Sequence, residues 1–192
     1  MTGPAVRGYW VTSALAFIGL HYSREASERL LAGLPRELRS FATRLGPADW
    51  CPRSHHTDLL KAIASANRIE ARAYDDLLSY GQYVGTEAAQ GFLRPFMLVV
   101  SLRLFAKKLP TLWARDHRGD GRLEVDIAQL DEARLPLRFS GMHGYDHVGV
   151  ATLGWIKGLM SRFDRQGLRL EQSGWSLAQG APDEMTCEVT WQ

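Results

Sequence analysis

The hydrophobic pattern of this chain changes its period at Gly119–Gly121. Before this point, apolar residues recur at the spacing of amphipathic helices. After it, the segment Leu123–Ile127 alternates apolar with charged residues, which is typical of a half-buried strand. We therefore expect one α+β domain over residues 1–192, with a helical part at about 1–118 and a sheet part at about 119–192.

Helices are expected along most of the first part. The segment Tyr9–His21 is apolar nearly all round, which predicts a helix covered by protein on every side. Ser23 is expected to cap the next helix, and Pro35 to begin the one after it. Further helices are expected around Leu59–Ile63, at Ile69–Val84 and at Phe96–Phe105, with Pro110 ending or kinking the last one and residues 48–53 forming a loop.

The second part predicts a β-β-α-β-β order, which gives a four-stranded antiparallel sheet and one helix on its face. The expected strands cover 123–127, 133–139, the segment from Leu168, and Met185–Trp191, and the helix covers Tyr145–Phe163. Pro136 indicates either an edge position or a missing ladder bond. Gly154 and Gly158 lie one helical turn apart and predict close approach of another backbone, from the sheet or from a second subunit.

Composition excludes several classes of protein. Lys and Arg number 23 against 21 Asp and Glu, so the formal charge of +2 gives no case for nucleic acid or an anionic membrane surface. The apolar runs are shorter than the 20 or so residues that span a bilayer, so we expect no membrane insertion and a cytoplasmic location. Two cysteines are too few for a disulfide framework.

Three groups of residues could in principle hold a metal. His143 and His147 lie four apart around Asp146, His117 follows a helix end, and Cys51 precedes His55 and His56. Helix-end charges explain the first two groups, and a solvated loop explains the third. We therefore predict no metal site, with His117, His143 and His147 as its weak candidates. No nucleophile–base pair or phosphate loop is present, so we predict no catalytic residues and no enzyme.

Aromatic residues are the remaining signal in the helical part. They indicate either ordinary core packing or an apolar pocket between the helices and the sheet. We predict the pocket, lined by Trp10, Phe17, Phe96, Val100, Trp113 and Trp155. Its ligand would be an apolar small molecule or an acyl chain.

Motifs at the change of period and at the end of the chain resemble an uncharacterised bacterial family of about 200 residues. They are Pro110-Thr-Leu-Trp113 before Gly119, Gly121-Arg-Leu-Glu-Val125, and the ending Asp183–Trp191 with Cys187-Glu. That family is similar to a fold group that includes the haem-nitric-oxide-binding domain, the 4-vinyl reductase domain and the small subunits of the tethering complex TRAPP. The resemblance implies helices followed by a β-β-α-β-β layer, and a role in sensing, ligand carriage or protein interaction.

The chain departs from the cofactor residues of that fold group. The haem domain takes its iron ligand from a histidine in the helix before the sheet, whereas Phe96–Ala106 holds none and His117 is the nearest. Its Tyr-x-Ser-x-Arg motif is not found after the first strand. The 4-vinyl reductase domain pairs a late cysteine with an earlier one. Here Cys187 stands at the late position, but Gly174-Trp175-Ser176 lie in the region of the earlier one.

Together these patterns predict a non-catalytic small-molecule-binding or regulatory module without a cofactor, haem being the disfavoured alternative. Two other functions stay open. The chain could be an interaction scaffold, as a homodimer or with a partner protein. It could also be a haem gas sensor or metal enzyme that uses His117 or the pair His143 and His147.

Overall fold

The structure, a computed structural model, describes residues 3–66, 70–119, 121–141, 146–163, 167–173 and 184–192. Within these ranges the chain forms mixed α+β architecture, with a helical first part and a four-stranded antiparallel sheet after it. The predicted fold class is confirmed. The helices of the first part are α1 (Gly8–His21), α2 (Arg24–Ala32), α3 (Arg36–Ala42), α4 (Arg53–Ser65), α5 (Glu70–Gln90), α6 (Arg94–Val99) and α7 (Leu102–Asp116).

The large sheet has the order β4-β5-β7-β6, with every neighbouring pair antiparallel. Apolar side chains of β5 and β7 alternate into the core, whereas Arg134 and Arg138 bond Glu188 and Glu184 on exposed positions. The chain elements of this layer are β4 (Arg122–Val125), η1 (Leu130–Glu132), β5 (Arg134–Ser140), α8 (Asp146–Met160), η2 (Ser161–Phe163), β6 (Arg169–Ser173) and β7 (Glu184–Thr190).

Pro136 lies in β5, which has a neighbour on each side, so the expectation of an edge position is wrong. The alternative holds, because proline has no N–H to give to the ladder. Opposite Glu188 it occupies a position where only its carbonyl is used, and that oxygen accepts from Asp126 N at 3.0 Å.

A second, small sheet was not predicted. Its strands are β1 (Ala5–Arg7), β2 (Trp50–Pro52) and β3 (His117–Arg118), in the order β2-β1-β3. The expected loop at residues 48–53 is thus wrong, because Trp50–Pro52 pairs with the N-terminal strand. The same pairing buries Cys51, which was placed in a solvated loop.

Helix ends follow the local chemistry in part. Ser23 caps α2 as predicted, its Oγ accepting from Ala26 N at 3.3 Å. The helix expected at Phe96–Phe105 is divided, because Val100 is extended and Ser101 caps α7 by accepting from Leu104 N. Pro110 lies inside α7 and does not end it.

Glycines bring α5 and α8 into direct backbone contact. A Cβ added at Gly154 would overlap the carbonyl oxygen of Leu78, and one added at Gly81 would overlap that of Ala151. Gly85 and Gly158 form the same contact one turn further on. The close approach predicted for the α8 glycines is confirmed. Its partner is α5 of the same chain, and not the sheet or a second subunit.

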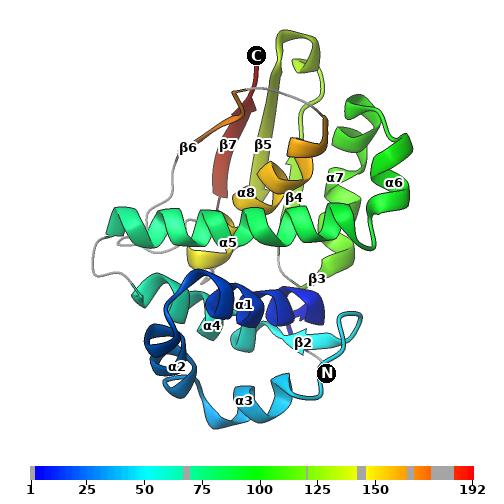
Figure 1. Cartoon of the computed structure of the whole chain (residues 1–192). Coiled ribbons are helices and arrows are strands. Elements are labelled where there is room, and N and C mark those ends of the chain that lie inside the picture. The colour runs from blue at the N-terminus through cyan, green and yellow to red at the C-terminus, as the bar shows by residue number, and fades with distance from the viewer. Residues whose placement is uncertain (1–2, 67–69, 120, 142–145, 164–166, 174–183) are drawn as a thin grey trace.

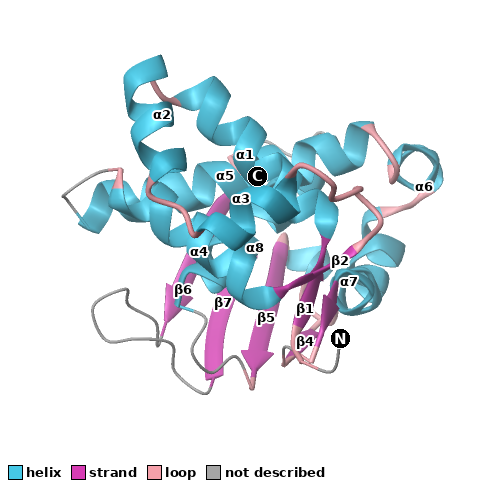
Figure 2. Ribbon diagram, turned by 90° about the horizontal axis from the view of Figure 1, so that it is seen from below, coloured by secondary structure: helices cyan, strands magenta, loops and turns pink. Residues whose placement is uncertain are grey.

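Figure 1 shows α5 crossing the middle of the molecule, with the large sheet on one side and α1 and α4 on the other. Figure 2, turned by 90°, shows the large-sheet strands β6, β7 and β5 side by side below the helices. One cluster of buried apolar side chains takes members from both parts of the chain. Among the described residues, no helix combines the length and the apolar character that crossing a membrane needs.

Candidate functional site

The small sheet places the candidate site where the helical part joins the large sheet. Strand β1 leads directly into α1, and α7 leads directly into β3. The pairing of Val6 with His117 therefore brings the start of α1 against the end of α7. Trp10, in the first turn of α1, reaches His117 in this way.

Rings surround Trp10 in the buried interior. The ring centroids of His117, His56 and Trp155 lie 5.2, 5.5 and 5.9 Å from that of Trp10. Trp113 stacks on His117 with centroids 4.5 Å apart. We name these five residues, Trp10, His56, Trp113, His117 and Trp155, the ring cluster.

Hydrogen bonds fix the proton on both imidazoles of the ring cluster. Tyr80 Oη donates its single proton to the carbonyl oxygen of Trp10 at 2.7 Å. The contact of 3.0 Å between Tyr80 Oη and His56 Nε2 is therefore donated by Nε2–H, so Nδ1 of neutral His56 carries the lone pair. Likewise His117 Nδ1 lies 2.9 Å from the Trp113 carbonyl, which only accepts, and this leaves the lone pair on Nε2.

Both imidazoles stay neutral at pH 7. Burial, followed by the positive charge of Arg53, lowers the pKa of His56 well below its ordinary value. The same two causes, in the same order, lower the pKa of His117. Among the described residues, His56 Nδ1 and His117 Nε2 have no hydrogen-bond partner, and neither do the indole N–H groups of the three tryptophans. Unpaired buried polar atoms are costly, so their concentration in one place marks the ring cluster for function.

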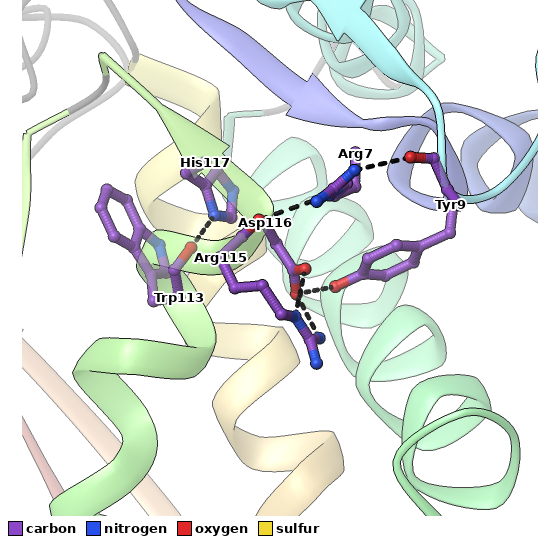
Figure 3. A network of polar contacts seen from close by, with 7 residues as sticks. Arg7, Tyr9, Trp113, Arg115, Asp116 and His117 are labelled. Carbon is purple, nitrogen blue, oxygen red and sulfur yellow. Dashed lines mark hydrogen bonds and ion pairs between the residues drawn. The ribbon is translucent and has the colours of Figure 1, made fainter.

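A second polar group lies beside the ring cluster, at the end of α7 (Figure 3). The buried carboxylate of Asp116 accepts from Tyr9 Oη at 2.8 Å and from Arg115 Nε and Nη2 at 3.0 and 3.1 Å. Burial, and next the charge of Asp116, raise the pKa of Tyr9 well above its ordinary value, so its hydroxyl stays a donor. Arg7 Nη1 donates to the carbonyl oxygen of Ala48.

The structure brings some of the predicted pocket residues together and separates others. Trp10, Trp113 and Trp155 belong to the ring cluster. Phe17 lies beyond Tyr80, with centroids 5.7 Å apart, whereas Phe96 and Val100 belong to α6 and its end. That the six predicted residues line one ligand pocket stays a prediction.

The other candidates do not add a residue to the described site. His143 is outside the described residues, and His147 lies in the first turn of α8. No three His, Cys, Asp or Glu residues within the described ranges could hold a metal together. Cys187 is buried as expected, and burial raises the pKa of its thiol to about 12.

The prediction missed His56 and Asp116. His56 was considered only beside Cys51, although its spacing to Leu59, Leu60 and Ile63 places it on the buried face of α4. That periodicity was the available signal. Asp116 had none, because an acidic residue at a helix C-terminus reads as unfavourable until Arg115 and Tyr9 are seen around it.

Comparison with known proteins gives the fold. No protein-family model and no curated protein matches the chain. An H-NOX protein from S. oneidensis, in an Fe(II)NO ligation state, is 12% identical with a TM-score of 0.71, over 97% of this chain and 99% of that one. An oxygen-binding H-NOX domain related to soluble guanylate cyclases is 10% identical with a TM-score of 0.63, over 97% and 95%. At this identity the likeness shows the fold alone, which confirms the predicted fold group.

The comparison also corrects the expectation of no cofactor. A further structure of this fold, described by the modulation of haem redox potential through porphyrin distortion, is 11% identical with a TM-score of 0.62, over 96% of this chain and 99% of that one. The fold neighbours carry Fe(II) or haem, so they contradict a prediction made from the missing histidine of the helix before the sheet.

The residues of this chain meet one requirement of a haem site directly. His117 offers a neutral, buried Nε2 lone pair, and its other nitrogen is fixed by a backbone carbonyl, as in metal-binding histidines. The rings of Trp10 and Trp113 fill the space beside it. A porphyrin would have to displace at least one of them.

Proposed function

We propose that this chain is a sensory module that binds haem between its helical part and its sheet, with His117 as the iron ligand. The carrying observation is the unpartnered Nε2 of His117, buried at the joint of an H-NOX-like fold. Haem, when bound, supplies an iron that a diatomic gas can reach. The absence of a nucleophile–base pair in the sequence supports sensing over catalysis.

The chain's own residues prepare His117 for this role. The Trp113 carbonyl holds Nδ1–H and so keeps the lone pair on Nε2. Burial beside Arg53 keeps the imidazole unprotonated, and an imidazole must be neutral to bind a metal. The pairing of β3 with β1 ties His117 to the start of α1, so a movement of His117 would reach that helix.

Haem titration of His117→Gly tests this proposal. The chain, expressed with added hemin, is expected to bind about one haem and to show a Soret band. His117→Gly should lose that band, and added imidazole, which can occupy the vacated space, should restore it. His55→Ala is the control, because His55 lies at the start of α4 outside the ring cluster. Haem binding that is absent, or equal in His117→Gly without imidazole, would refute the proposal.

A second candidate function is an interaction scaffold. Large apolar side chains are exposed on and around α6, among them Leu98 at 64% and Val99 at 83%. Exposed apolar residues that gather in one place mark interaction surfaces. Light scattering tests the homodimer form of this function, and a monomer at high concentration would contradict that form. The haem proposal does not depend on the result.

A further inference from the structure

A cleft opens beside Asp116, on the other side of the α7 end from the ring cluster. Its volume is about 320 Å³. Pro47, Ala48 and Phe92 give it apolar walls, and Arg7, Tyr9, Arg115 and Asp116 give it polar groups. This combination of apolar walls with a few convergent polar groups is typical of small-molecule sites.

The charges of the cleft favour an anion. Among its lining residues, two arginines face one aspartate, which leaves a net charge of +1. The Asp116 carboxylate is already engaged by Arg115 and Tyr9, so it is poorly placed to attract a cation. Arg7 has no carboxylate partner among the described residues. Its Nη1 and Nε donate instead to the backbone carbonyls of Ala48 and Arg115.

Both guanidinium groups keep donors for a ligand. An arginine has five N–H groups, and the bonds above engage only a part of each set. Aromatic rings hold both groups in position. Arg7 lies 4.0 Å over the Trp50 ring, and Arg115 lies 5.1 Å over the Phe92 ring. Positioned guanidinium groups bind carboxylates through paired hydrogen bonds.

The exposed ring of Phe92 is the second half of the site. It is 52% exposed, although it contacts Tyr9 with ring centroids 5.0 Å apart. A large aromatic side chain left half in water at the wall of a cleft gains burial if an apolar group covers it. We infer that this cleft binds a small organic carboxylate with an apolar body, its carboxylate on Arg7 and Arg115 and its apolar body on Phe92.

Calorimetric titration with hexanoate tests the inference on the chain purified without haem. Saturable binding is expected below about 10 mM. Hexylamine has the same body with the opposite charge, and is expected to bind at least tenfold more weakly. Arg7→Gln should weaken hexanoate binding by about tenfold, since it removes the charge. Phe92→Ala should weaken it by about fivefold, since it removes the apolar wall.

Two control variants lie outside the cleft. Arg118→Gln removes another arginine that stacks on Trp50, and Leu98→Ala removes another exposed apolar side chain. Both are expected to bind hexanoate as the unaltered chain does. If Arg7→Gln loses its circular dichroism signal, the Phe92→Ala result and the hexylamine comparison still decide. Hexylamine binding as tightly as hexanoate, equal losses in the controls, or no saturable binding would each overturn the inference, and none of these outcomes depends on haem.

Discussion

Helix α8 makes two buried contacts, one through glycines and the other through a large aromatic side chain. Its face with Gly154 and Gly158 meets α5 backbone to backbone. Its residue Trp155 meets the ring of Trp10. The glycine contact uses helices whose polar groups bond within each helix, so close approach costs no hydrogen bond. The ring cluster fills its space with large side chains, of which the three indole N–H groups and one nitrogen of each histidine have no partner among the described residues.

The two contacts therefore differ in what they contribute. The glycine contact is expected to stabilise the fold, because close-packed backbones lose many van der Waals contacts when they are separated. The ring cluster is expected to contribute less, because its unpaired polar atoms are costly. A ligand or a water molecule that pairs with these atoms would raise the stability of the folded chain. Three substitutions or changes of condition sharpen this comparison.

The largest effect is expected at the glycine contact. Gly154→Val should lower the free energy of unfolding by more than about 3 kcal/mol, because its side chain would overlap the α5 backbone at Leu78. Urea denaturation measures it. The control is Gly19→Ala in α1, where an added Cβ meets nothing within 4 Å, and a gain of up to about 1 kcal/mol is expected. A loss below about 1 kcal/mol at Gly154 would show that the two helices separate easily.

The second largest effect on stability is expected from acid, through the two histidines of the ring cluster. The pKa values of His56 and His117 are lowered in the folded chain, so only the unfolded chain takes up protons on them below about pH 6.5. Stability is therefore constant above that pH and falls below it by up to about 1.4 kcal/mol per pH unit for each imidazole. Urea denaturation between pH 7.5 and 5.5 measures the slope. His56→Phe should reduce it, and an unchanged stability over this range would contradict the assigned protonation.

The smallest effect is expected from one hydroxyl group. Tyr80→Phe removes a buried donor to the Trp10 carbonyl and the acceptor of His56 Nε2–H. The Trp10 carbonyl keeps its bond within α1, but His56 Nε2–H is left unpaired, which should cost about 1–3 kcal/mol. Tyr83→Phe, on the same helix with a half-buried ring, should change stability by less than about 0.5 kcal/mol. Equal losses in the two variants would mean that Tyr80 contributes no more than an ordinary tyrosine.

The sequence predicts the elements whose evidence is local. The segment Tyr9–His21, which is apolar nearly all round, became α1, and alternation in the last strand became β7. The expected cover on every side of α1 is wrong, because Ala16, Gly19 and Leu20 are exposed. Ser23 acts within three residues of itself, so its capping could be recognised from the pattern. The close approach of the α8 glycines was equally visible, because glycines one turn apart have few other uses in a helix.

Partners far along the chain could not be predicted in the same way. Strands β1, β2 and β3 are two or three residues long, too short to show alternation. The sequence around Gly154 does not indicate that Gly81 packs against it. The candidate site was the hardest part to predict. The Trp113 carbonyl sets which nitrogen of His117 is free, and the ring packed against His117 is that of Trp10, a residue near the opposite end of the helical part.

The small sheet also sets an order of events during synthesis. Its central strand, β1, precedes the helices α1 to α7 in the chain, but one of its edges pairs with β3, at His117–Arg118, which follows them. That edge stays open until the ribosome has delivered the whole helical part. A growing chain exposes such an edge to wrong neighbours. Strand β1 is thus made before its second neighbour, and the ring cluster, which depends on this pairing, is completed only after α7 has emerged.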